Sequence, residues 1–85
     1  EVVLTDLFEE AFEKLTKSEK QSDRKAVALL GDNPKHPGLR VKKMEGGRNI
    51  WEARASVRLR MTFEMMGETI TLRNVGKHDK ALKRP

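Results

Sequence analysis

The 85-residue chain contains no cysteine and no tyrosine, and its aromatic residues are three phenylalanines and one tryptophan. The absence of cysteine excludes disulfide bonds and thiol chemistry, and nothing indicates an oxidising compartment. No stretch approaches the roughly 20 consecutive apolar residues of a membrane span, and no signal-peptide pattern is present. We therefore expect a single cytoplasmic domain over residues 1–85, with no membrane partner.

Positive charge is what the chain has in excess. Lysine and arginine total 18 against 13 aspartate and glutamate residues, which gives a formal net charge of +5. This is the electrostatic footprint of a nucleic-acid-binding protein, although a modest excess also serves solubility or an acidic protein partner. The sequence contains no metal-ligand cluster, P-loop or nucleophile elbow, so we expect neither a metal nor another cofactor.

The most regular pattern is a strict alternation of apolar and polar residues that begins at Trp51. One parity is apolar and comprises Trp51, Ala53, Ala55, Val57, Leu59, Met61, Phe63 and Met65. The other is polar and comprises Glu52, Arg54, Ser56, Arg58, Arg60, Thr62 and Glu64. Because side chains on a strand point alternately to opposite faces, the pattern predicts a sheet with one apolar and one cationic face. That cationic face is either an anion-binding surface or an ordinary solvated one, balanced by its own glutamates.

Two helices are expected in the first third of the chain. Asp6 with Glu9 fits a capping box at the start of the first helix, and Ser18 with Gln21 repeats the signature for the second. We expect the second helix to end at Gly31. Because the connection between them is short, the two helices should form an antiparallel hairpin that packs on one face of the sheet.

Strands are expected at residues 2–4, 39–44, 50–56, 59–66 and 69–75, with a turn at 45–49. The apolar residues keep the same alternation through Val57 on both sides of the loop between the third and fourth strands. Both strands therefore bury the same set of positions only if this loop has an odd number of residues. This loop pairs Arg54 with Arg60 and Glu52 with Thr62. Like charges directly opposite each other destabilise a sheet, so the arginine pair needs a compensating interaction.

The last hairpin is expected to turn at Gly67-Glu68, with glycine first. Its register sets Phe63 against Leu72 and Thr62 against Arg73. The predicted class is α+β: an N-terminal strand and a helical hairpin pack on a mostly antiparallel four-stranded sheet, and a short basic C-terminal segment follows.

Several residues of this sheet suit phosphate chemistry. Guanidinium groups bind phosphate oxygens bidentately and stay charged at any relevant pH. His78 is the side chain suited to donate or accept a proton near neutral pH, although a lone histidine in a basic segment is often inert. Arg40, Lys42 and Lys43 either extend the cationic surface or only aid solubility.

The series NPKHPGLR (33–40), IWEAR (50–54), LRMTF (59–63) and LRNVGKHD (72–79) resembles the RelE/ParE superfamily. These are toxins of bacterial or archaeal type II toxin–antitoxin systems, and the similarity is to the RelE-like mRNA interferase branch. It runs over essentially the whole chain. The resemblance implies a RelE-like, microbial RNase-type fold, a cognate small acidic antitoxin, and mRNA and the ribosome as further partners.

Members of the RelE branch cleave mRNA in the decoding site without a metal, by attack of a ribose 2′-hydroxyl on the adjacent phosphate. The resemblance implies that Arg60 stabilises the phosphorane, that Arg73 lies near the scissile phosphate and that His78 is the general acid. Glu52 is the nearest candidate base. Further RNA contacts are expected from Arg40, Lys42, Lys43, Arg54, Arg58, Lys77 and Lys80.

The chain departs from the family pattern at two positions. Leu82 stands where relatives often have a tyrosine that takes part in catalysis or stacks on a base, and Leu59 replaces an aromatic residue before the strand arginine. The ParE branch shares the fold, lacks the nuclease residues and acts on DNA gyrase. A non-catalytic module, either a gyrase-inhibiting toxin or a degenerate binding domain, is therefore the alternative to an endoribonuclease.

Overall fold

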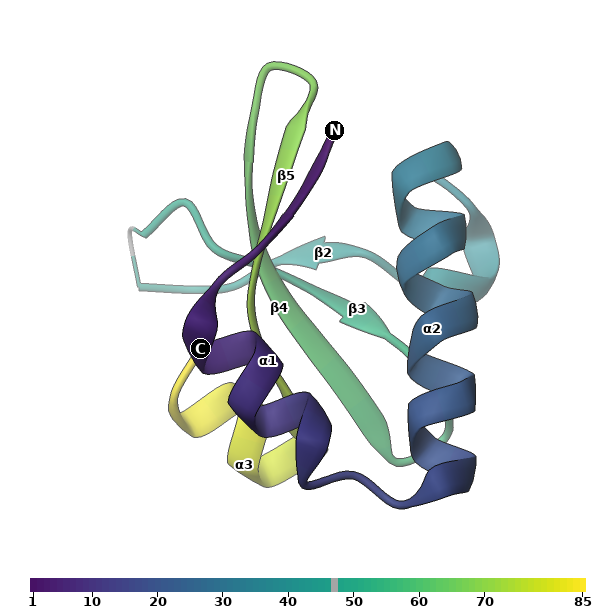
Figure 1. Ribbon diagram of the computed structural model, residues 1–85. Helices are drawn as coiled ribbons and strands as arrows, with labels where there is room; N and C mark the ends of the chain where they lie inside the picture. The colour runs from purple at the N-terminus through teal and green to yellow at the C-terminus, as the bar shows by residue number, and fades with distance from the viewer. Residues whose placement is uncertain (47) are drawn as a thin grey trace.

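The computed structural model describes residues 1–46 and 48–85. The elements in chain order are β1 (Val2–Leu4), α1 (Asp6–Glu13), α2 (Lys17–Asp32), the 3₁₀ helix η1 (Pro37–Leu39), β2 (Lys42–Lys43), β3 (Trp51–Arg54), β4 (Leu59–Met66), β5 (Thr69–Lys77) and α3 (His78–Lys83). The strands form one sheet in the order β1-β5-β4-β3-β2, with β1 parallel to β5 and the other neighbours antiparallel (Figure 1). The predicted α+β class is confirmed, with the N-terminal strand as a fifth member of the sheet.

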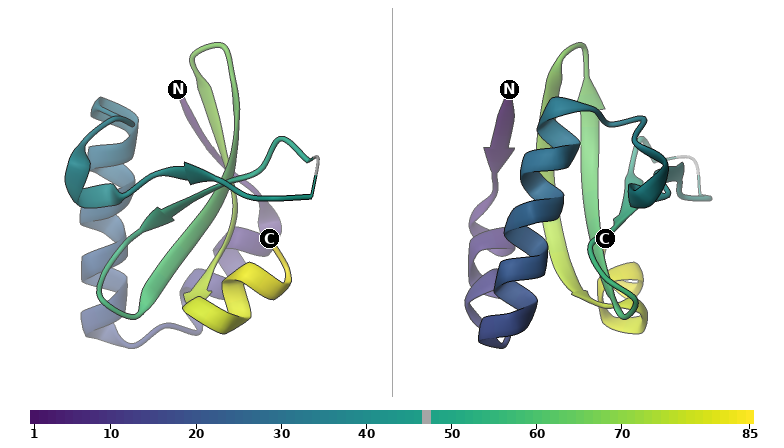
Figure 2. Two further views of the ribbon diagram at one scale, coloured as in Figure 1. Left: turned by 180° about the vertical axis from the view of Figure 1, so that it is seen from behind. Right: turned by 90° about the vertical axis from the view of Figure 1, so that its right-hand side faces the viewer.

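The helices cover the sheet from both sides. Helices α1 and α2 run in opposite directions on one face, as the short connection predicts, and α3 lies on the other face (Figure 2). The core lies beneath α1 and α2 and includes half of the apolar residues of the alternating segment, whereas Val57 at the turn is 76% exposed. Its fully buried members from the three long strands are Ala53, Leu59, Met61, Phe63 and Leu72. None of the helices in the described ranges has the length and apolarity to cross a membrane.

Both long helices begin at a threonine rather than at the predicted residues. The Thr5 hydroxyl accepts a hydrogen bond from the first turn of α1. The Thr16 hydroxyl and the Glu19 side chain form a reciprocal capping box at the start of α2. The expected caps, Asp6 and Ser18, lie inside their helices. A threonine in extended backbone geometry satisfies the same free N–H groups as aspartate or serine, so the sequence signature was ambiguous by one or two positions.

Gly31 lies inside α2 and does not end it, because the helix continues to Asp32. A Cβ atom at Gly31 would lie 2.9 Å from Cγ2 of Val2 in β1. That distance is too short for two carbon atoms. The absence of a side chain at Gly31 therefore allows α2 to pack closely against β1.

The predicted strand at 39–44 is much shorter than expected. Residues Pro37–Leu39 form a 3₁₀ turn in which the His36 ring accepts a hydrogen bond from the Gly38 N–H. Arg40 follows in the left-handed region with φ of 47°, which ends any extended run at that point. Only Lys42–Lys43 pairs with β3. The turn expected at 45–49 includes Gly47, which lies outside the described residues.

A β-bulge changes the predicted register between β4 and β5. Phe63 pairs with Leu72 as predicted, but Thr62 pairs with Asn74, and Arg73 is the extra residue. The bulge resets the alternation, so that Leu72 and Val75 both point into the core although they are three residues apart. The predicted pairing of Thr62 with Arg73 was therefore wrong.

Asp23 is the anomaly of the helical layer. Its side chain on α2 is fully buried, and neither carboxylate oxygen has a hydrogen-bond partner within residues 1–46 and 48–85. Burial raises the pKa of Asp23 from 3.8 to about 7, because a low-dielectric environment disfavours the charged form. Below pH 3.8 the carboxyl is protonated in the folded and unfolded states alike. As the pH rises towards 7, only the unfolded state ionises freely, so folding loses stability across this interval.

We expect Asp23→Asn to be more stable than the unchanged protein by roughly 2 to 4 kcal/mol above pH 7, and by much less near pH 4. The amide has the same shape and never ionises. Urea unfolding at pH 4.5 and pH 8 measures the difference. Asp32→Asn, at an exposed position on the same helix, is the matched control and should show no such pH dependence. An equal gain at both pH values would contradict the assigned cause.

Candidate functional site

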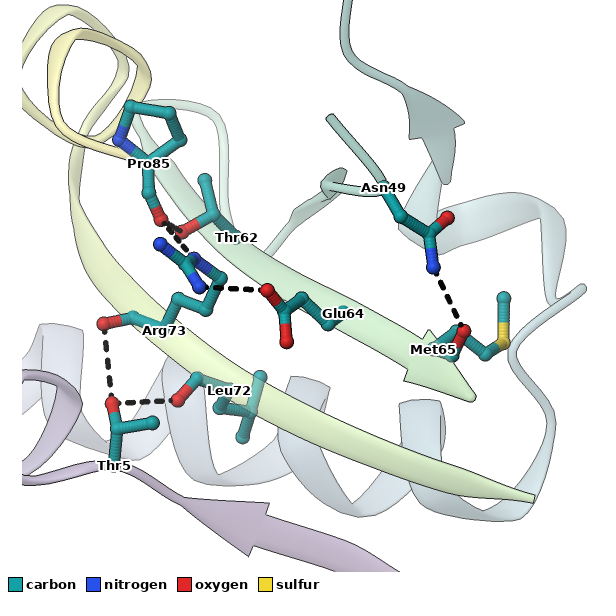
Figure 3. Close-up of polar contacts among 8 residues, drawn as sticks. All are labelled: Thr5, Asn49, Thr62, Glu64, Met65, Leu72, Arg73 and Pro85. Atoms are coloured by element: carbon teal, nitrogen blue, oxygen red, sulfur yellow. Dashed lines mark hydrogen bonds and ion pairs between the residues drawn. The ribbon is translucent and has the colours of Figure 1, made fainter. Parts of the chain in front are cut away.

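The polar faces of β3 and β4 bring together residues that the sequence analysis singled out. Glu52 lies opposite Thr62, and Arg54 lies opposite Arg60, as predicted. The face is less open to solvent than expected, because Thr62 is fully buried and Glu52 is only 8% exposed. The chain after α3 folds back over this side of the sheet and covers Thr62 (Figure 3).

The two facing arginines share a partner that offsets their repulsion. Arg54 Nε donates to the Ser56 carbonyl oxygen at 3.3 Å, and Arg60 Nη1 donates to the same oxygen at 2.9 Å. Arg60 Nη1 also lies 3.0 Å from the carbonyl oxygen of Leu59 and 3.4 Å from that of Val57. The backbone carbonyls of the tight turn thus supply the compensating interaction that the sequence analysis required.

Arg73 sits at the bulge of β5 with two partners. Its Nη1 lies 2.8 Å from Glu64 Oε1 on β4, and its Nε donates to the Pro85 carbonyl oxygen at 3.0 Å (Figure 3). About one third of each side chain of the ion pair is exposed. The pair is therefore open enough for an incoming anion to compete with the carboxylate for the guanidinium.

Two further donors lie beside Arg73: Thr62, which the sequence analysis placed near it, and Asn74, which the sequence analysis missed. The Thr62 hydroxyl donates to the Pro85 carbonyl oxygen at 2.9 Å, and Asn74 Nδ2 donates to the Arg84 carbonyl oxygen at 2.8 Å. Together they form a cluster of donors, Thr62–Arg73–Asn74, which holds the end of the chain. Asn74 belongs to it because of the bulge, and the only sequence signal of the bulge was the spacing of Leu72 and Val75.

His78 begins α3 beside the arginine turn. Its backbone N–H donates to the Arg58 carbonyl oxygen at 3.0 Å, so the end of β5 lies against the start of β4, as the strand order predicted. The ring Nδ1 lies 3.4 Å from Asp79 Oδ1, and the side chain is 57% exposed. An exposed imidazole can exchange protons with solvent or with a bound ligand.

The predicted catalytic residues therefore fall into two groups. Arg60 and His78 lie near the turn at one end of the β3–β4 hairpin. Glu52 and Arg73 lie on strands that flank Thr62, further along the sheet. One extended phosphate backbone could contact both groups, whereas a single phosphate could not contact all four residues unless side chains move.

The outlying basic residues lie on other parts of the surface. Lys42 Nζ is 4.0 Å from Glu52 Oε1, which links the edge strand β2 to the polar face. Arg40 and Lys43 are exposed near the same edge.

Lys77 and Lys80 line an open pocket of about 640 Å³ between α1 and α3. Lys77 pairs with Leu59 beside the arginine turn, but it lines this pocket together with Lys80. Within residues 1–46 and 48–85, no cluster of three or more acidic or histidine side chains could hold a metal ion.

Neither protein-family models nor the curated proteins match this chain. Solved structures do. YafQ from Escherichia coli strain BL21(DE3) superposes with a TM-score of 0.79 at 10% identity, over 94% of each chain. The YoeB/ParE toxin from Agrobacterium tumefaciens gives 0.73 at 13% identity, over 92% of this chain and 98% of that one. A chain of the intact E. coli RelBE toxin–antitoxin complex gives 0.69 at 14% identity, over 89% of this chain and 93% of that one.

Identities this low establish the architecture and not the chemistry. Each superposition nevertheless spans about nine tenths of both chains, so the likeness covers the helical hairpin and the sheet together. The protein has the RelE-like toxin fold.

Proposed function

We propose that this chain is the toxin of a toxin–antitoxin system and that it cleaves mRNA on the ribosome. The observation that carries the proposal is the likeness in fold to YafQ, YoeB and RelE toxins over nearly the full length. A sheet face with Arg54, Arg60 and Arg73 supports it independently, because three guanidinium groups on adjacent strands suit a phosphate backbone.

In the proposed reaction, the ribose 2′-oxygen attacks the adjacent phosphorus and the bond to the 5′-oxygen breaks, leaving a 2′,3′-cyclic phosphate. Glu52 takes the proton from the 2′-hydroxyl, and His78 gives a proton to the departing 5′-oxygen. Side chains must move to bring the two groups of residues to one phosphate, where Arg60 and Arg73 stabilise the charge that develops on the phosphorane. No other co-reactant is needed to balance the step.

The cluster Thr62–Arg73–Asn74 has a defined part in this proposal. Its donors now hold the carbonyl oxygens of Arg84 and Pro85. The oxygens of a phosphate group carry negative charge, so they accept hydrogen bonds from these donors more strongly than the carbonyl oxygens do. RNA binding therefore requires these last residues to move away from the sheet.

The remaining basic residues extend the RNA path in the proposal. Arg54 and Arg58 lie at the turn beside Arg60, and Arg40, Lys42 and Lys43 lie towards the edge strand β2, so a strand of RNA would cross β3 from one group to the other. Lys77 and Lys80 would contact the ribosome or RNA further along. The proposed inhibitor is a small acidic antitoxin, in line with the antitoxin-bound relatives DinJ-YafQ and YoeB-YefM.

A non-catalytic module is the second candidate, and two observations favour it. Arg73 already has a carboxylate partner in Glu64. Leu82 occupies the place in α3 where relatives often carry a functional tyrosine, and the chain has no tyrosine at all. A gyrase-inhibiting toxin or a degenerate binding domain would keep the fold without cleaving RNA.

Arg60→Ala should lower mRNA cleavage by about 10²-fold or more, because it removes a charge that stabilises the phosphorane. Mapping mRNA 5′ ends after induction in cells measures this, with codon-phased cuts expected for the unchanged chain. Arg48→Ala, at an exposed position outside the polar face, is the matched control. Inhibited DNA supercoiling with intact mRNA would instead support the gyrase candidate.

Arg73→Ala should also lower cleavage by about 10²-fold or more. Glu64→Gln separates catalysis from structure, because it removes the ion pair but leaves the guanidinium in place. We expect Glu64→Gln to keep or raise activity, whereas Arg73→Ala loses it. Circular dichroism should show both variants folded. Equal losses in the two variants would mean that the ion pair only supports the sheet.

A further inference from the structure

A second surface lies on the opposite side of the sheet from the arginines. There β1, α1 and α2 border an open pocket of about 490 Å³, a size typical of ligand and side-chain binding sites. Its lining residues include the apolar side chains of Leu4, Phe8, Phe12, Val27 and Ala28. The proposed RNA chemistry uses none of them.

Asp23 is also part of the lining and has no partner there. The side chain is fully buried, and both carboxylate oxygens lack a hydrogen bond within the described parts of the chain. A buried carboxylate without partners destabilises a fold, and an apolar residue in its place would avoid the cost. An unsatisfied acid that lines an open pocket is therefore suited to receive a donor from outside.

The rest of the lining also attracts cations. Glu9 and Glu13 of α1 are exposed at the rim of the pocket, and Glu13 Oε2 lies 3.4 Å from Lys20 Nζ of α2. From α2, Arg24 Cζ lies 5.3 Å and Lys20 Nζ 5.8 Å from the centre of the Phe12 ring, in cation–π geometry. Arg24 is the cation among the lining residues, and it lies over this ring without pairing with the buried carboxylate.

Apolar surface is also exposed at the pocket itself. Leu4, one of the lining residues, is 45% exposed. An exposed apolar side chain at the mouth of an apolar pocket is typical of a protein-interaction site. The occupant should therefore be a segment with apolar side chains around its cation, and a lone amine would leave this surface uncovered.

We propose that this pocket is the docking site for a segment of a partner polypeptide that carries a lysine or arginine among apolar residues. On binding, the lining side chains would move so that the cation reaches the carboxylate of Asp23, and the apolar neighbours would cover Leu4 and Val27. Charge complementarity selects this occupant, since Asp23, which has no partner among the described residues, and the exposed Glu9 repel a polyanion such as RNA. The site does not depend on the proposed RNA cleavage and can exist in either candidate function.

Calorimetric titration of the full chain with two synthetic peptides tests the proposal. Both are short amphipathic peptides rich in leucine. One has a central lysine, and the other has norleucine, which keeps the apolar stem without the charge. At pH 8 the lysine peptide should bind roughly 30-fold or more tightly than the norleucine peptide. In nuclear magnetic resonance spectra, the shifted amides should belong to α1 and α2.

Variants locate the effect at the buried acid. Asp23→Asn should abolish the preference for lysine, whereas Asp32→Asn should retain it. A double variant, Glu9→Gln with Glu13→Gln, changes only exposed residues and should weaken the preference for lysine severalfold. It tests the proposal even if Asp23→Asn is poorly folded. In the unchanged chain the preference should fall from pH 8 to pH 5.5, because Asp23 becomes protonated.

Three results would each overturn the proposal. The two peptides could bind equally well, neither could bind at millimolar concentration, or the shifted amides could lie on β3–β5. Absence of mRNA cleavage by the unchanged chain would leave this test unaffected, so the two proposals fail separately.

Discussion

Strand β4 is the constraint on which the rest of the structure depends. It has hydrogen-bonded neighbours on both sides, and its side chains alternate between the core and the polar face. Leu59, Met61 and Phe63 are completely buried beneath the helices. A shift of one residue in its pairing would turn all three towards the polar side. The position of Arg60 opposite Arg54 follows from the same register, so the core determines where the arginines lie.

The polar face shows how a small sheet accommodates concentrated positive charge. The turn after β3 offers its carbonyl oxygens to Arg54 and Arg60, and Glu64 pairs with Arg73. Each guanidinium is thereby held in place while part of it stays exposed. Such preorganisation is what binding of a phosphate requires, because fewer side chains must be ordered when the ligand arrives. The same contacts also stabilise the free protein, so a structural role is compatible with the binding role that we propose.

The two faces of the sheet differ in chemistry. Arg54, Arg60 and Arg73 lie on the side of α3, whereas the side of α1 and α2 carries an apolar pocket, Asp23 without a partner in the described ranges, and exposed glutamates, together with Lys20 and Arg24. The net charge of +5 describes neither face. Two partners of opposite charge can therefore be bound at once by the surfaces we propose, since the core separates them.

Local pattern in the sequence was enough to predict the fold class, the helical hairpin and the pairing of β3 with β4. Strict alternation leaves one register that buries the apolar residues, and an odd turn at Val57 follows from it. The helix starts were misplaced by one or two residues because Thr5 and Thr16 are equivalent caps.

The features that only the tertiary structure decided depend on contacts between residues far apart in the sequence. The bulge at Arg73 arises because both Leu72 and Val75 must reach the core, and the return of Pro85 onto Thr62 joins residues 23 positions apart. The burial of Asp23 depends on helix packing, which helical periodicity does not specify. Alternation along a strand is a property of neighbouring residues, whereas partners for a carboxylate or a guanidinium come from wherever the chain returns.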